Sequence, residues 1–147
     1  EPIISDKIAK CRSDGEQVIF TLDTHGENYL ETAEGKKLPV MHCVDGTAGH
    51  MLYGRIAECV EESDIVIKKS SFGSLELADL LKKCGFDEVE LCGLVTDICV
   101  ASNAIIAKAA LPESRIVVDS KACASFDKKA HESALAVMRS IQIDVLD

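Results

Sequence analysis

The sequence lacks any apolar run long enough to cross a lipid bilayer, and nothing near Glu1 resembles a secretory signal peptide. These absences exclude a membrane-spanning protein and predict a cytoplasmic one with no membrane partner. Basic residues are also scarce, because 16 lysines and arginines face 25 aspartates and glutamates and leave a net charge of -9. A nucleic-acid-binding protein needs a basic face for the phosphates. We therefore expect no nucleic-acid partner, and a small molecule or another protein instead.

Paired cysteine spacing is absent as well. The seven cysteines are odd in number and contain no Cys-x-x-Cys pair, which favours reduced thiols in a cytoplasm over a disulfide framework. The chain also contains no internal repeat, low-complexity tract or linker. With 147 residues, of which 47% are hydrophobic, residues 1–147 are predicted to form a single globular domain.

Short apolar runs rich in β-branched residues alternate with helical patterns along most of the chain. Strands are predicted at 17–22, 64–68, 88–92, 115–118 and 141–146, and helices at 3–11, 75–84, 98–110 and 127–140. This alternation predicts an α/β fold with three α/β/α layers and a doubly wound, mostly parallel sheet. The long polar segment 26–49 interrupts the pattern, and a loop of that length is usually functional. The almost entirely apolar helix 98–110 is expected to be buried on several sides or to form a subunit contact.

Cys99 lies where the chain passes from the predicted strand 88–92 into an alanine-rich helix. Thr96 and Asp97 are favourable residues at a helix N-terminus, where unpaired backbone N–H groups and the helix dipole stabilise a thiolate. The thiolate is the reactive form of cysteine. The sequence therefore indicates that Cys99 is a nucleophile, and the alternative is a small buried apolar residue.

Asp23 and His25 follow the predicted strand 17–22, and a spacing of two places both side chains on one side of extended backbone. His42 comes from the far end of the long polar segment, so a return of that loop to the strand end would complete the group. One carboxylate and two imidazoles are ordinary ligands of zinc, manganese or iron. The alternative is that Asp23 caps a turn and His42 is an ordinary loop histidine.

Lys68 is the last residue of the predicted strand 64–68, and Lys69 directly follows it. One of them should point into the crevice at the carboxyl end of the sheet, where open α/β sheets bind ligands. A cation there would stabilise a neighbouring thiolate, whereas the alternative is a solvated lysine pair. His50 and His131, in a loop and on the polar flank of a helix, are expected to be solvated rather than to bind a metal.

From Glu1 to about Ser125 the chain resembles the isochorismatase-like cysteine hydrolases, and among them the nicotinamidases. The matching segments are Asp23 to His25, Leu38 to Cys43, Gly46-Thr47, Lys69 to Ser74 and Gly93 to Val100. By this resemblance Cys99 is the nucleophile and Lys69, rather than Lys68, is the catalytic lysine. The metal ligands are Asp23, His25 and His42, a triad that many other branches of the family lack.

The resemblance implies a cysteine amidohydrolase whose Cys99 thiolate attacks a small carboxamide, with nicotinamide as the expected substrate. Ammonia leaves, and water then hydrolyses the thioester to nicotinate. It also implies an oxyanion site at Val95 and Thr96 with a cis peptide bond before Thr96, one divalent transition metal that orients the substrate ring, and a homo-oligomer. Two alternatives stay open: another isochorismatase-type hydrolysis, and an inactive relative that binds a metabolite or assembles into an oligomer.

The catalytic triad of the family also contains an aspartate, which ends a first strand before the helix corresponding to 3–11. No residue of this sequence is assigned that role, because Asp6 lies inside the helix. In the doubly wound order 3-2-1-4-5-6 the first strand is central, between the strands that end at Leu22 and Cys92. We therefore expect these residues to belong to a longer polypeptide, in which about 30 preceding residues supply the strand and the aspartate.

Overall fold

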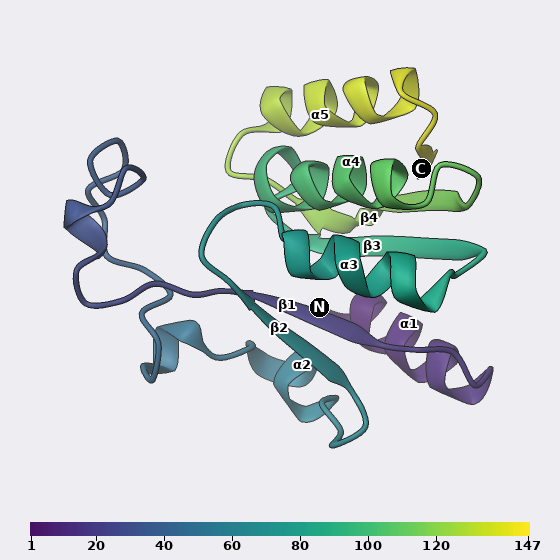
Figure 1. Ribbon diagram of the computed structural model, residues 1–147, viewed down its shortest axis with the longest axis horizontal. Helices are drawn as coiled ribbons and strands as arrows, with labels where there is room; N and C mark the ends of the chain where they lie inside the picture. The colour runs from purple at the N-terminus through teal and green to yellow at the C-terminus, as the bar shows by residue number, and fades with distance from the viewer. The chain divides into compact units, whose positions relative to one another are not determined.

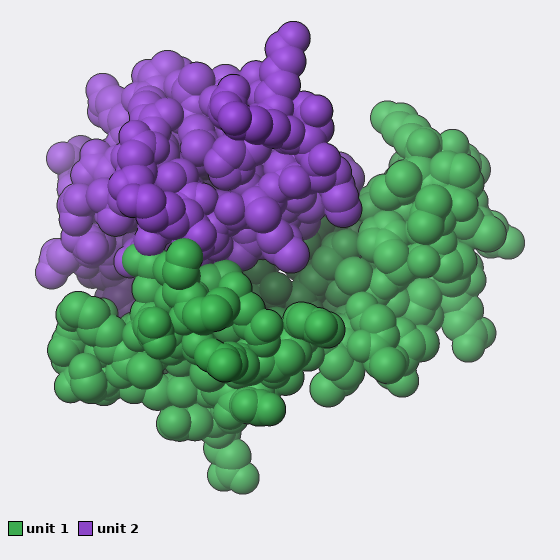
Figure 2. Space-filling view, turned by 180° about the vertical axis from the view of Figure 1, so that it is seen from behind, with its two compact units in different colours: residues 1–71 green, residues 72–147 purple.

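The computed structural model describes all 147 residues. They form two compact units, Glu1–Ser71 and Phe72–Asp147, which Figure 2 shows in different colours. Each unit contains its own parallel β-sheet together with helices (Figure 1), which confirms the predicted α/β class. None of the helices combines the length and the apolar composition that spanning a lipid bilayer requires.

The first unit contains a two-stranded sheet. Its elements are α1 (Pro2–Ser13), β1 (Ile19–Asp23), α2 (Gly54–Glu58) and β2 (Ile65–Lys69). The two strands are parallel, and their register runs from Ile19 opposite Ile65 to Asp23 opposite Lys69. Both strands therefore end at the same edge with a charged residue, which places a carboxylate beside an ammonium group.

A small apolar core holds α1 against β1. Ile8 of the helix is buried with Val18 and Phe20, which lie just before and within the strand. Partly buried residues of α1, β1, α2 and the preceding loop surround this core: Ile4, Cys11, Leu22, Leu52, Ile56 and Cys59. The burial of this apolar face fixes the direction of β1, and with it the position of the residues that follow the strand.

The second unit contains three parallel strands in the order β3-β4-β5. Its elements are α3 (Leu75–Cys84), β3 (Glu88–Leu94), α4 (Ala101–Ala110), β4 (Arg115–Ala124), α5 (Lys128–Ser140) and β5 (Asp144–Leu146), with a π-helical turn at Thr96–Val100. α4 contacts both α3 and α5 (Figure 1). Ile116, Val117 and Val118 of β4 are almost fully buried, because strands flank β4 on both edges and α4 packs against it.

Local signals in the sequence account for the ends of the helices. The Ser74 hydroxyl accepts a hydrogen bond from the Leu77 N–H at the start of α3, and the Asp127 carboxylate accepts one from the Ala130 N–H at the start of α5. Gly85 ends α3 in the left-handed conformation, with φ of 65°, which glycine adopts without a steric penalty. The predicted bounds of α3 are confirmed, and those of α5 are correct to within one residue.

The strand order agrees with the prediction inside each sheet, but no ladder joins β1 to β3. β4 continues to Ala124, well beyond the predicted end at Val118. The register between β3 and β4 shifts after Leu91, so that Gly93 pairs with Cys123. The residues of β4 directly after Val118 are polar, namely Asp119, Ser120 and Lys121. They end the apolar run on which the prediction was based, so the predicted strand is too short.

Candidate functional site

Backbone hydrogen bonds tie the long loop to the end of β1. The His25 N–H donates to the Cys43 carbonyl at 2.9 Å, and the His25 carbonyl accepts from the Asp45 N–H at 2.9 Å. The loop thus returns to the strand end as expected from the sequence. This return places His42 beside Asp23.

Two carboxylates and two imidazoles converge at this place, from Asp23, His25, Glu34 and His42. One ligand atom from each lies within 4.8 Å of all the others. The four carboxylate-to-Nε2 distances that join the acids to the histidines are 3.2, 3.5, 3.6 and 3.7 Å. Two donors bound to one metal at about 2.0–2.2 Å in tetrahedral geometry lie about 3.3–3.6 Å apart. The donor set and its spacing therefore fit a zinc, manganese or iron ion.

The two imidazoles present Nε2 to this group. Nδ1 of His42 lies 2.8 Å from the Val40 carbonyl, and because a carbonyl only accepts, Nδ1 carries the proton. In the neutral ring Nε2 then keeps its lone pair, which is the form that binds a metal. The buried His25 ring packs against the rings of Tyr29 and His42, at centroid distances of 4.6 and 4.8 Å. Both rings are thus oriented before any ion binds.

Glu34 is the member of the group that the sequence did not predict. It lies in a tight turn in which the Gly35 N–H donates to the Thr32 hydroxyl at 3.0 Å. A Cβ at Gly35 would lie only 2.0 Å from the Tyr29 carbonyl oxygen, so this close approach of two backbone segments requires glycine. The signal in the sequence was one glutamate among several in a polar segment, and no periodicity distinguishes it.

The carboxylates also influence the neighbouring phenol. Tyr29 is fully buried, and its hydroxyl donates to the Leu38 carbonyl at 2.9 Å. Burial, and then the negative charges of Glu34 and Asp23, raise the pKa of Tyr29 above its usual range. The group therefore carries an excess of negative charge that a bound cation would neutralise.

Lys69 is directed into the first unit, whereas Lys68 is directed to its surface. The Lys69 side chain is 4% exposed, and its Nζ lies 3.3 Å from Asp23 Oδ1 and donates to the Ser71 carbonyl at 3.1 Å. Lys68 is half exposed and pairs with Asp45 at 2.7 Å. Of the two adjacent lysines, the one beside the candidate metal group is thus Lys69, the residue preferred by the resemblance.

The prediction that His50 is solvated is wrong. His50 is buried, and its Nε2 lies 2.8 Å from the Thr24 hydroxyl while its Nδ1 lies 3.4 Å from Asp45. The ring fills the space between the end of β1 and the returning loop, which explains its burial. His50 therefore braces the backbone between Asp23 and His25 and does not join the metal group.

Cys99 lies in the second unit, in the π-helical turn that follows β3. The Val95 carbonyl accepts from the N–H groups of Ile98 and Val100, at 3.1 and 3.2 Å. The second of these bonds spans five residues and defines the π turn, a geometry that is frequent at functional sites. The Asn103 side chain donates to the Cys99 carbonyl at 2.8 Å, so α4 also fixes the backbone at Cys99.

Two expectations about this turn are corrected by the structure. Thr96 and Asp97 do not cap it, because their side chains bond to His131 and Ser125 of a later part of the chain. The cis peptide bond lies between Leu94 and Val95, one residue earlier than expected. It lies where β3 ends, because the strand continues through Leu94 and the turn begins directly after Val95. Val95 and Thr96 nonetheless both lie at the start of the π-helical turn that contains Cys99.

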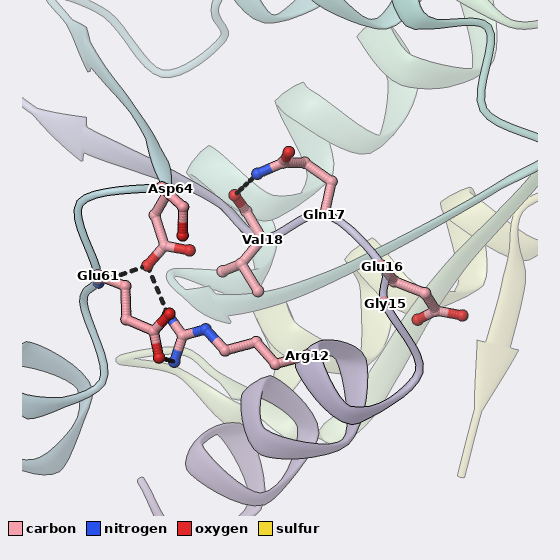
Figure 3. Close-up of a pocket in the computed structure, with 8 residues that line it drawn as sticks. Arg12, Gly15, Glu16, Gln17, Val18, Glu61 and Asp64 are labelled. Atoms are coloured by element: carbon pink, nitrogen blue, oxygen red, sulfur yellow. Dashed lines mark hydrogen bonds and ion pairs between the residues drawn. The ribbon is translucent and has the colours of Figure 1, made fainter.

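Two of the cavities in the first unit lie at opposite ends of its sheet. The larger, of about 420 Å³, lies at the amino ends of the strands (Figure 3), and Arg12 beside it already pairs with Asp64 at 2.5 Å and Glu61 at 3.4 Å. The other, of about 370 Å³, is lined by His25 and Glu34 at the carboxyl ends. We assign the candidate site to this second cavity, because the metal donors and Lys69 lie at that end.

Comparisons with known proteins identify the family of the chain. An isochorismatase domain matches residues 2–147. An isochorismatase family protein of Bacillus subtilis is 30% identical over 84% of this chain and 70% of its own length. The nicotinamidase/pyrazinamidase of Mycobacterium tuberculosis is 27% identical over 97% of this chain and 82% of its own. The crystal structure of a nicotinamidase/pyrazinamidase from Bacillus subtilis superposes with a TM-score of 0.87, at 27% identity, over 99% of this chain and 83% of its own. The chain belongs to the isochorismatase family of hydrolases.

Proposed function

We propose that this chain hydrolyses a small carboxamide, with nicotinamide as the preferred substrate and nicotinate and ammonia as products. The observation that carries the proposal is the convergence of Asp23, His25, Glu34 and His42 beside the buried Lys69. A metal-donor group is what the resemblance to nicotinamidases implies, and many other branches of the family lack its triad Asp23, His25 and His42. The names of the relatives in Bacillus subtilis and Mycobacterium tuberculosis support the same substrate class.

In the proposed reaction the Cys99 thiolate attacks the carboxamide carbon and forms a carbon–sulfur bond, while the carbonyl electrons move to oxygen. Backbone N–H groups at Val95 and Thr96 stabilise this oxyanion. The intermediate then collapses, the carbon–nitrogen bond breaks, and the nitrogen leaves as ammonia with the proton that the Cys99 thiol lost when it became the thiolate. Water attacks the thioester, which releases the acid and returns the thiolate. The resemblance assigns the role of catalytic lysine to Lys69.

Asp23, His25, Glu34 and His42 are the residues that would hold a zinc, manganese or iron ion. When bound, such an ion supplies a Lewis-acidic coordination position that orients the ring nitrogen of the substrate. The protein's own contribution is to place Asp23 at the end of β1 and the other three donors in the loop that follows. The bonds of His25 to Cys43 and Asp45 fix the return of that loop.

We further propose that the functional protein contains one more strand, which supplies the third member of the catalytic triad. β1 and β3 each pair with a strand on one edge only, and a buried unpaired backbone group costs about 1–3 kcal/mol. A strand that paired with either open edge would satisfy such groups on that edge. An aspartate at its carboxyl end would carry protons between the thiol, the leaving nitrogen and water.

Native mass spectrometry of the protein from its source tests this strand. We expect a subunit heavier than the 15.9 kDa of the 147 residues by about 3 kDa, the mass of a strand with its connection, or a bound peptide of that mass. A fully active subunit of 15.9 kDa without a bound peptide would contradict the proposal. The same spectrum reports the number of subunits. We also propose that the protein forms a homo-oligomer, because the apolar side chain of Ile105 on α4 is 45% exposed.

Ammonia release from nicotinamide tests the proposed function. We expect the full-length protein to release one ammonia per nicotinate formed, and to do so faster than from amides that lack a ring nitrogen. Release from other amides but not from nicotinamide would favour another hydrolysis within the family. No release from any amide, with metal bound and Cys99 reduced, would favour an inactive relative that binds a metabolite.

A further inference from the structure

A histidine from α5 holds the turn that carries the candidate nucleophile. Nδ1 of His131, in the first turn of the helix, lies 2.8 Å from the Thr96 hydroxyl. Thr96 is completely buried, and His131 is partly buried beside it. The sequence predicts a solvated His131, and this contact shows that the prediction is wrong, because the polar flank of α5 faces the turn at this point.

We propose that His131 is a positioning residue for the reaction. It fixes Thr96, and through Thr96 the backbone at Val95 and the approach of Cys99. The inference rests on the proposed function, because it concerns the same nucleophile. It goes beyond that function because it assigns a role to a residue that contacts neither the donor group nor the thiol in any bond described above.

The position of Thr96 in the turn is the first reason for this assignment. Thr96 directly follows Val95, whose carbonyl accepts both of the bonds that close the π turn. A shift of the Thr96 side chain therefore moves the backbone that begins the turn, three residues before Cys99. Every buried side-chain polar atom of the protein has a partner. Loss of the His131 ring would remove the partner of a buried hydroxyl, and the turn would relax to recover one.

The surrounding contacts are the second reason. The Ser125 hydroxyl donates to the Asp97 carboxylate and accepts from the Asp127 N–H at 3.5 Å, so the connection before α5 also binds the turn. These bonds keep α5 docked when the imidazole is removed. A substitution of His131 should therefore change the position of Thr96 while the fold stays intact. An experiment can then measure the first effect without the second.

The test compares variants of the full-length, metal-loaded protein. His131→Leu removes the hydrogen bond, His131→Asn keeps an amide nitrogen near the place of Nδ1, and Glu132→Leu is the control on the exposed neighbour. For His131→Leu we expect kcat to fall by about 10- to 100-fold, the range that a small misplacement of reacting groups causes. KM should stay within about threefold, because substrate binding does not use this contact. His131→Asn should recover most of kcat, and Glu132→Leu should retain all of it.

The rate of alkylation of Cys99 by iodoacetamide gives a second readout that needs no substrate. We expect it to fall several-fold in His131→Leu and in Thr96→Val, and to be nearly retained in Thr96→Ser. The double variant His131→Leu/Thr96→Val should be alkylated no more slowly than the slower of the two single variants, since both changes break the same Thr96–His131 bond. A lower melting temperature with unchanged kcat and alkylation rate, or additive losses in the double variant, would overturn the proposal. If neither the parent protein nor any variant releases ammonia from nicotinamide, the proposed function fails. The alkylation rates still decide the role of His131 in that case.

Discussion

Replacement of Cys99 with alanine is expected to lower kcat for nicotinamide hydrolysis by about 10⁴-fold or more, the loss typical of removing a covalent nucleophile. KM and the melting temperature should change little, because the side chain is small and lies in a turn fixed by Asn103 and Thr96. Ammonia release at saturating nicotinamide and thermal unfolding measure the two effects. A single turnover should also be absent, since the thioester cannot form.

The control uses the other cysteines. Cys43 and Cys123, like Cys99, are partly buried thiols without a disulfide. Replacement of Cys123 with alanine should leave kcat within about threefold. Limited alkylation followed by peptide mapping should label Cys99 in step with the loss of activity. Inactivation that follows modification of Cys43 or Cys123 while Cys99 stays unmodified would show that the nucleophile is assigned wrongly.

Removal of the metal by a chelator, or His42→Ala, is expected to lower kcat/KM for nicotinamide by at least about 10²-fold. Changes in the outer shell of a metal site already cost about 10- to 100-fold, and His42 lies in the donor group itself. We expect KM to rise and kcat to fall together, because a ring that is no longer oriented binds more weakly and reacts less often. The bound metal per chain, measured by elemental analysis, should fall in parallel.

Glu34→Gln and Glu31→Gln form a matched pair for this prediction. Both glutamates lie in the same polar segment, but Glu34 belongs to the donor group and Glu31 is exposed. Loss of metal and activity in the Glu34 variant alone would place Glu34 in the metal site. Equal activity of parent and chelated protein, with no metal in the chelated sample, would contradict the proposed role of the group.

The spacing of apolar residues was sufficient to predict a helix or strand where one side of that element is apolar. The predicted bounds of α3 are correct because apolar residues recur at 75, 77, 80 and 81 and Gly85 stops the helix. In the structure Leu77 and Leu81 of this pattern are buried together with Ala78. The proximity of Asp23 and His25 was also predictable, because residues two apart share a side of extended backbone. Local geometry of this kind depends on few residues, and the sequence contains all of them.

The remaining features depend on contacts between residues distant in the chain. Glu34 joins the donor group only because Gly35 lets the loop approach Tyr29 closely. His50 is buried because Asp45 and Thr24 come together around it. Neither contact leaves a periodic signal, since each results from the path of one irregular loop. The roles of such residues can be identified only once the path of the loop is known.

Asp23 divides its two carboxylate oxygens between different partners. Oδ1 lies 3.3 Å from the Lys69 ammonium, and Oδ2 faces the imidazoles of His25 and His42. The occupancy of the donor group and the placement of the lysine are therefore thermodynamically coupled, and such coupling is reciprocal. A variant with tighter metal binding would also have an altered Asp23–Lys69 ion pair. Metal affinity and the position of the Lys69 ammonium therefore cannot change independently while they share this carboxylate.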